Sequence, residues 1–161
     1  RATSKGPVAV AGLSLGALVA QRLASAARGW PAQYRPDALC LVATSNDLVG
    51  TGVDGDLARA IGVPDRLAAA GWKRPELERL SVLLAPQGPP AVDPDRIVMV
   101  LGTADGVTPY RGGRMLARDW RVPPTNVFAS WRGHFSAGLD LYRDPRPLER
   151  LVEVMRRGRQ R

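Results

Sequence analysis

Cysteine and histidine each occur only once in this chain of 161 residues, as Cys40 and His134. A single cysteine excludes an internal disulfide, and one cysteine with one histidine is too few to build a metal-ligand cluster. Cys40 lies within a continuous apolar run, so we expect a buried and inert thiol. We expect no metal and no cofactor.

Long apolar runs are absent too, and none approaches the roughly 20 residues of a membrane-spanning helix. The length suits a single domain, and the apolar and charged fractions of 45% and 24% are ordinary for a globular protein. The phosphate-binding pattern Gly-x-x-x-x-Gly-Lys is missing, so no nucleotide site is indicated. We expect a cytoplasmic protein. In the alternative interpretation, Arg1, Lys5 and the apolar stretch ending in Ala24-Ser25-Ala26 form a secretory signal.

Lysine is scarce, and the formal net charge of +8 comes almost wholly from arginine. A strongly basic chain suggests a nucleic-acid partner. The arginines, however, are scattered and lack interleaved aromatic residues, and they form a true cluster only at residues 156–161. We therefore expect no nucleic-acid partner.

The stretch VAVAGLSLGALVAQRLASAAR, residues 8–28, predicts a short strand, a tight turn and a helix that is largely buried. Gly12 and Gly16 flank Ser14, and we expect a Cβ at either glycine to collide with neighbouring backbone. In such a turn the Ser14 hydroxyl projects outward, and the Leu15 amide points from the helix N-terminus toward developing negative charge. The pattern thus predicts a nucleophile elbow with half of an oxyanion hole, although Gly-x-Ser-x-Gly also arises by chance.

Further apolar runs and amphipathic segments alternate along the chain. Strands are expected at residues 8–11, 38–43, 96–102 and 126–131, and helices at residues 15–28, 109–119 and 147–157. Continuous apolar strands are typical of a parallel sheet covered on both faces, joined by right-handed crossovers. Residues 48–95 break this alternation, and short helices are expected within them at residues 64–70 and 75–84.

A serine nucleophile needs a base to take its proton and a carboxylate to orient that base. His134 is the only histidine, and it follows the last predicted strand. Asp105 follows the strand at residues 96–102 and is the preferred carboxylate. Asp47, after the strand at residues 38–43, is the alternative acid. The order Ser, Asp, His is that of the α/β-hydrolases and differs from the orders of the chymotrypsin and subtilisin folds.

Taken together, these motifs resemble the α/β-hydrolase superfamily over nearly all of the chain, but only the C-terminal half of that fold. The resemblance implies a mostly parallel sheet with helices on both faces, truncated at the N-terminus, with residues 48–95 as a small helical lid within a single partial domain. The missing N-terminal half would then be needed as a partner, and it would supply the second oxyanion donor. Without it the first strand would be an open sheet edge, so we expect the chain alone to fold poorly.

The resemblance also implies a chemistry. Superfamily members that open epoxides or displace halide carry aspartate at the elbow, so a serine there favours cleavage of esters, thioesters or amides. We expect an esterase-like hydrolase of a small-molecule ester, working through an acyl-enzyme on Ser14 with Asp105 and His134. The alternative is a non-catalytic binding or scaffolding protein on the same fold.

Overall fold

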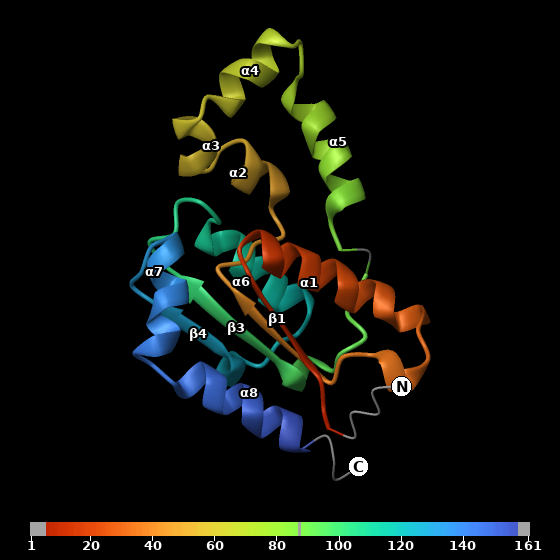
Figure 1. Cartoon of the computed structure of the whole chain (residues 1–161). Helices are drawn as coiled ribbons and strands as arrows, with labels where there is room; N and C mark the ends of the chain where they lie inside the picture. Colours follow the sequence, from red (N-terminus) through yellow and green to blue (C-terminus); the bar gives the residue numbers. More distant parts are fainter. Residues whose placement is uncertain (1–5, 87, 158–161) are drawn as a thin grey trace.

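Four parallel strands form the centre of the protein in the computed structural model, which describes residues 6–86 and 88–157 (Figure 1). The strands lie side by side in sequence order: β1 (Ala9–Leu13), β2 (Ala38–Val42), β3 (Ile97–Gly102) and β4 (Val127–Ser130). All three neighbouring pairs are parallel. The predicted α/β fold with a parallel sheet is confirmed, and each predicted strand corresponds to an observed one.

Helices cover both faces of the sheet (Figure 1). On one face α1 (Leu15–Ala26) packs on β1 and β2, and α6 (Tyr110–Asp119) packs on β3. On the other face α8 (Arg146–Arg157) packs on β2 and β3, and α7 (His134–Leu139) contacts β3. Short 3-10 turns complete the chain at Ala27–Gly29, Ala32–Tyr34, Pro94–Arg96, Pro124–Asn126 and Asp140–Tyr142.

Burial on both faces explains why the two central strands, β2 and β3, are apolar throughout. Every residue of β2 and β3 is buried, because successive side chains point to opposite faces and both faces are covered. Leu39 and Met99 belong to the cluster that also contains residues of α1 and α6. Cys40 and Val100 pack on the other side, against Leu151 of α8.

Helix α1 is less buried than its sequence predicts. Ala17, Ala20 and Ala24 face the sheet and are buried, but Leu15 and Val19 are 73% and 58% exposed. The expectation of a largely buried helix is therefore wrong for one of its sides. The helix packs on β1 and β2, and side chains that face away from the sheet, such as Val19, are largely exposed.

Between β2 and β3 the chain leaves the sheet on the side where the strands end (Figure 1). It forms four short helices there: α2 (Leu48–Gly52), α3 (Asp56–Ala60), α4 (Val63–Ala69) and α5 (Arg74–Leu84). The last two match the helices expected at residues 64–70 and 75–84. Helices α2 and α3 were not predicted, because Gly50 and Gly52 within α2 and Gly55 before α3 favour an open loop in isolation.

Strand β1 forms one edge of the described sheet. Val8, which precedes the strand, and Leu13, its last residue, are about half exposed, so apolar side chains lie at this edge. No helix in the described ranges is both long and apolar enough to cross a bilayer. Of the predicted arginine cluster, Arg156 and Arg157 end α8, and residues 158–161 lie outside the described residues.

Candidate active site

Ser14 forms the turn between β1 and α1, with φ 55° and ψ −119°. A non-glycine residue in such a conformation costs of order 1–3 kcal/mol and persists only where its surroundings hold it. Here the Ser14 amide donates to the Val42 carbonyl at 3.0 Å, and its own carbonyl accepts from the Ala17 amide at 2.9 Å. The side chain makes no capping bond to α1, so its hydroxyl is left free for another partner.

The two glycines beside this turn have different roles. A Cβ on Gly12 would lie 2.3 Å from the Gly16 oxygen, so β1 and α1 can approach this closely only without a side chain there. A Cβ on Gly16 would meet nothing within 4 Å outside its own stretch of helix. The prediction of a collision is therefore confirmed for Gly12 and wrong for Gly16, because Gly16 already lies in the first turn of α1.

The structure brings together the three residues that the sequence singled out. The Nε2 atom of His134 lies 2.8 Å from the Ser14 Oγ, and its Nδ1 lies 2.9 Å from Oδ2 of Asp105. His134 is 7% exposed and Asp105 6%. Because an ionised carboxylate can only accept, Nδ1 carries the imidazole proton, and the lone pair of Nε2 faces the serine hydroxyl.

Asp105 is held by more than the histidine. Its Oδ1 accepts from the backbone amides of Val107 and Thr108 at 2.9 and 2.8 Å, and its Oδ2 accepts from the Thr108 hydroxyl at 2.7 Å. Thr108 Oγ1 also lies 3.2 Å from Nδ1 of His134. Sequence reasoning assigned no role to Thr108. The available signal was a threonine three residues after an aspartate, a spacing typical of turns in which the side chain bonds nearby backbone.

The loops that carry Asp105 and His134 are joined to each other. Backbone amides of Thr103 and Ala104 donate to the carbonyls of Ser130 and Arg132, at 2.8 and 3.1 Å. His134 itself is the first residue of α7, a short helix that was not predicted from the sequence. His134 therefore belongs to a short helix that packs on β3, which restricts its movement more than a free loop would.

The alternative acid, Asp47, has another function. Its Oδ1 accepts from the Gly50 amide at 2.7 Å, which caps the N-terminus of α2. Its side chain is exposed, and its own amide donates to the Ser45 hydroxyl at 3.0 Å. The carboxylate beside His134 is that of Asp105.

Leu15 is the first residue of α1, so its amide has no acceptor within the helix. Helix N-termini carry a partial positive charge, which favours an anion placed against them. The position of Leu15 is thus the one predicted for an oxyanion donor, directly after the serine.

Gly50, Gly52 and Gly55 match the spacing Gly-x-Gly-x-x-Gly. That pattern indicates a dinucleotide site only where it follows a strand and opens a helix. Here it begins inside α2 and ends just before α3. Packing explains two of the glycines, since a Cβ on Gly50 would lie 2.3 Å from the Asp47 carboxylate, and one on Gly55 would lie 2.6 Å from the Thr51 carbonyl. Within the described ranges no group of three or more His, Cys, Asp or Glu side chains could hold a metal ion.

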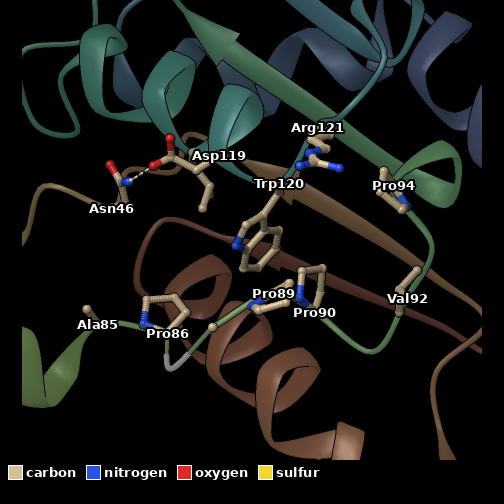
Figure 2. Close-up of a pocket in the computed structure, with 12 residues that line it drawn as sticks. Asn46, Ala85, Pro86, Pro89, Pro90, Val92, Pro94, Asp119, Trp120 and Arg121 are labelled. Carbon is tan, nitrogen blue, oxygen red and sulfur yellow. Dashed lines mark hydrogen bonds between the residues drawn. The ribbon is translucent and has the colours of Figure 1, made fainter.

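Two cavities bear on the choice of site. One of about 260 Å³ lies beside Ser14 and Leu15, under α2 and α3. Another, of about 700 Å³, is shown in Figure 2, where Trp120 faces Pro89 and Pro90. None of its described lining residues is a serine, cysteine or histidine. The smaller cavity is therefore the one associated with the candidate chemistry.

Comparison of the chain with protein-family models found no match, and a search of curated proteins found none either. The descriptions of the fold and of the candidate site therefore rest on the structure. The chain is a small α/β domain with a four-stranded parallel sheet, whose carboxyl edge carries Ser14, His134 and Asp105 in one hydrogen-bonded row.

Proposed function

We propose that this protein is a serine hydrolase of the α/β-hydrolase type that cleaves carboxylic esters. The observation that carries the proposal is the row of contacts from the Ser14 hydroxyl through both ring nitrogens of His134 to the Asp105 carboxylate. Two contacts of 2.8 and 2.9 Å, made by residues far apart in sequence, match what nucleophilic catalysis by serine requires.

The reaction would begin with the serine. The Ser14 oxygen attacks the ester carbonyl carbon while Nε2 of His134 takes the hydroxyl proton. Asp105 keeps its carboxylate against Nδ1 and stabilises the imidazolium that forms. The negative charge on the former carbonyl oxygen faces the Leu15 amide at the N-terminus of α1.

The acyl-enzyme then forms and is hydrolysed. As the tetrahedral intermediate collapses, the carbon–oxygen bond to the alcohol breaks, and His134 returns its proton to the leaving oxygen. Water enters, gives a proton to His134 and attacks the acyl carbon. The carboxylic acid leaves as Ser14 recovers its proton, so the enzyme ends as it began.

The surroundings of the site support the same proposal. The strained turn at Ser14 presents the hydroxyl away from the backbone, as a nucleophile elbow does. The hydrogen bonds from Val107 and Thr108 fix the Asp105 carboxylate before any substrate arrives. Helices α2 to α5 lie over the carboxyl edge of the sheet, where a lid over the site would lie (Figure 1).

A fluorophosphonate probe tests this function directly, because it labels only serines that are activated as nucleophiles. We expect labelling of the folded protein at Ser14, mapped by peptide mass spectrometry, and none in Ser14→Ala. Ser81→Ala is the matched control, since Ser81 lies on α5 and its hydroxyl donates only to the Glu78 carbonyl. Absence of label and of p-nitrophenyl ester hydrolysis in folded protein would instead support the non-catalytic alternative.

A further inference from the structure

We infer that the substrate carries an uncharged aliphatic chain of up to about ten carbon atoms, and that this chain lies in the cavity beside Ser14. The inference rests on the proposed function, because it assigns a substrate class to the same site. The cavity of about 260 Å³ has Ser14 and Leu15 in its wall. A chain attached to an ester carbonyl at Ser14 can therefore enter it directly.

The cavity lies between the body of the domain and the helices that leave it. Leu18 of α1 and Val107 after β3 form the body side. Leu48 of α2, Leu57 of α3 and Val63 of α4 form the opposite side. These short helices thus have a defined role at the site: they supply the outer wall of the space where the chain would bind.

The chemistry of the wall selects the chain. None of the thirteen described lining residues carries a charge, and most of them are aliphatic. The Thr108 hydroxyl, one of the few polar groups, already donates to Asp105. The Thr51 hydroxyl also lines the cavity, buried without a hydrogen-bond partner among the described residues, but a neutral hydroxyl does not neutralise a charge. A carboxylate or ammonium group on the bound chain would therefore lose its hydration without gaining an opposite charge, which is strongly unfavourable. An apolar chain gives up no hydrogen bonds with water, and its transfer from water into the cavity is favourable.

The volume limits the length of the chain. An engineered apolar cavity of about 150 Å³ holds benzene, which has six carbons. By proportion, a cavity of about 260 Å³ holds on the order of ten. Until the cavity is full, each added CH₂ should raise kcat/KM about fourfold, which corresponds to the roughly 0.8 kcal/mol gained by burying it.

Ala58 offers a way to change that limit. It is a buried residue of α3 that lines the cavity, so Ala58→Leu would fill part of the space with three further carbons. The longest well-accepted chain should then shorten by about three carbons, because the added side chain takes the place of the end of the substrate. Ala60→Leu is the matched control: Ala60 lies on the same helix, is exposed and is not part of the wall.

The experiment compares two ester series on the purified protein. One series varies the acyl chain of p-nitrophenyl esters from acetate to myristate, and the other varies the alcohol chain of acetate esters over the same range. We expect kcat/KM to rise and then fall in the series whose chain enters the cavity. In that series Ala58→Leu should move the maximum to shorter chains and Ala60→Leu should not, and an ester with a terminal carboxylate should be rejected.

A binding measurement separates this inference from the proposed function. Calorimetry on Ser14→Ala follows binding of intact methyl esters, with Ala58→Leu added to the same background. One outcome is that ester affinity depends on chain length and Ala58→Leu shifts the preferred length to shorter esters, while the wild type hydrolyses none of them. That outcome would uphold the cavity inference and reject the hydrolase. A second outcome is that the protein hydrolyses the esters with a kcat/KM that is independent of chain length in both series and unchanged by Ala58→Leu. That outcome would overturn the inference but remain consistent with the proposed hydrolase. Neither binding nor turnover would overturn both.

Discussion

Gly12 of β1 and Gly16 of α1 meet through bare backbone, since a Cβ on Gly12 would lie 2.3 Å from the Gly16 oxygen. We expect Gly12→Ala to cost about 1–3 kcal/mol in the free energy of unfolding, the usual range for forcing extra atoms into packed structure. Gly16→Ala should be neutral or stabilise by up to about 1 kcal/mol, because alanine is the better helix former. Urea unfolding of the two variants measures the difference, and equal tolerance of both would contradict the tight turn.

Removal of the nucleophile or the base should abolish hydrolysis to a similar degree. In comparable systems such single substitutions lower kcat on the order of a millionfold, and removing both costs little more because the groups act as a unit. We therefore expect Ser14→Ala, His134→Ala and the double variant to show nearly equal residual rates with a p-nitrophenyl ester. Turnover near the wild-type rate in His134→Ala would reject the assignment, since the chain has no second histidine.

Substitution of the two candidate acids should separate their roles. Asp105→Asn replaces the acceptor beside Nδ1 of His134 and favours the wrong tautomer, which lowers kcat by about 10⁴ in comparable triads. Asp47→Asn should leave kcat nearly unchanged, because asparagine also caps helices well. Steady-state kinetics with matched circular dichroism spectra checks the ranking, and the reverse order would move the acid to Asp47.

Apolar side chains at the β1 edge and on the outer side of α1 should promote self-association. Val8 and Val19 are half or more exposed, and unpaired apolar edges template further pairing. We expect the Val8→Lys, Val19→Lys double variant to show less concentration-dependent light scattering than the wild type. A variant with two lysines at exposed, neutral polar positions, Gln33→Lys with Thr125→Lys, adds the same charge and controls for charge alone. Equal scattering by both variants would show that this surface does not drive association.

Burial raises the pKa of the Cys40 thiol to about 11, from an ordinary value of 9.0. Between these values the unfolded chain has lost a proton that the folded protein keeps, so stability falls as pH rises from about 9 to about 11. We expect Cys40→Ala to lose less of its free energy of unfolding than the wild type between neutral pH and about pH 10. Urea titrations at both pH values measure this, and rapid alkylation of Cys40 in folded protein would contradict its burial.

The sequence predicted those parts of the fold that depend on local pattern. The continuous apolar runs of β2 and β3 and the glycine-serine turn leave few alternatives, so the strands and Ser14 could be placed in advance. Asp105 and His134 could be named because each directly follows a strand, and parallel strands end at one edge of the sheet. The helix-forming stretch around residues 15–28 also predicted α1 closely, except for its last turn.

Other features could not be read from the sequence because they depend on contacts between distant segments. Helices α2, α3 and α7 have only five or six residues each, and helices this short form only where neighbours hold them. Thr108 gains its role only when Asp105 and His134 come within reach. The exposed side of α1 is as apolar as a buried one, so its pattern could not reveal that this side would be exposed.

The contact between Ser14 and His134 joins residues that are 120 positions apart, across all four strands of the described sheet. Because translation proceeds from the N-terminus and strands are added in spatial order, the turn at Ser14 can form long before its base exists. The nucleophile would therefore stay unactivated on the ribosome until β4 and α7 have emerged. During refolding, hydrolytic activity would likewise return only with the last long-range step and not with early collapse of the sheet. Recovery of activity would therefore be a sensitive probe of complete folding.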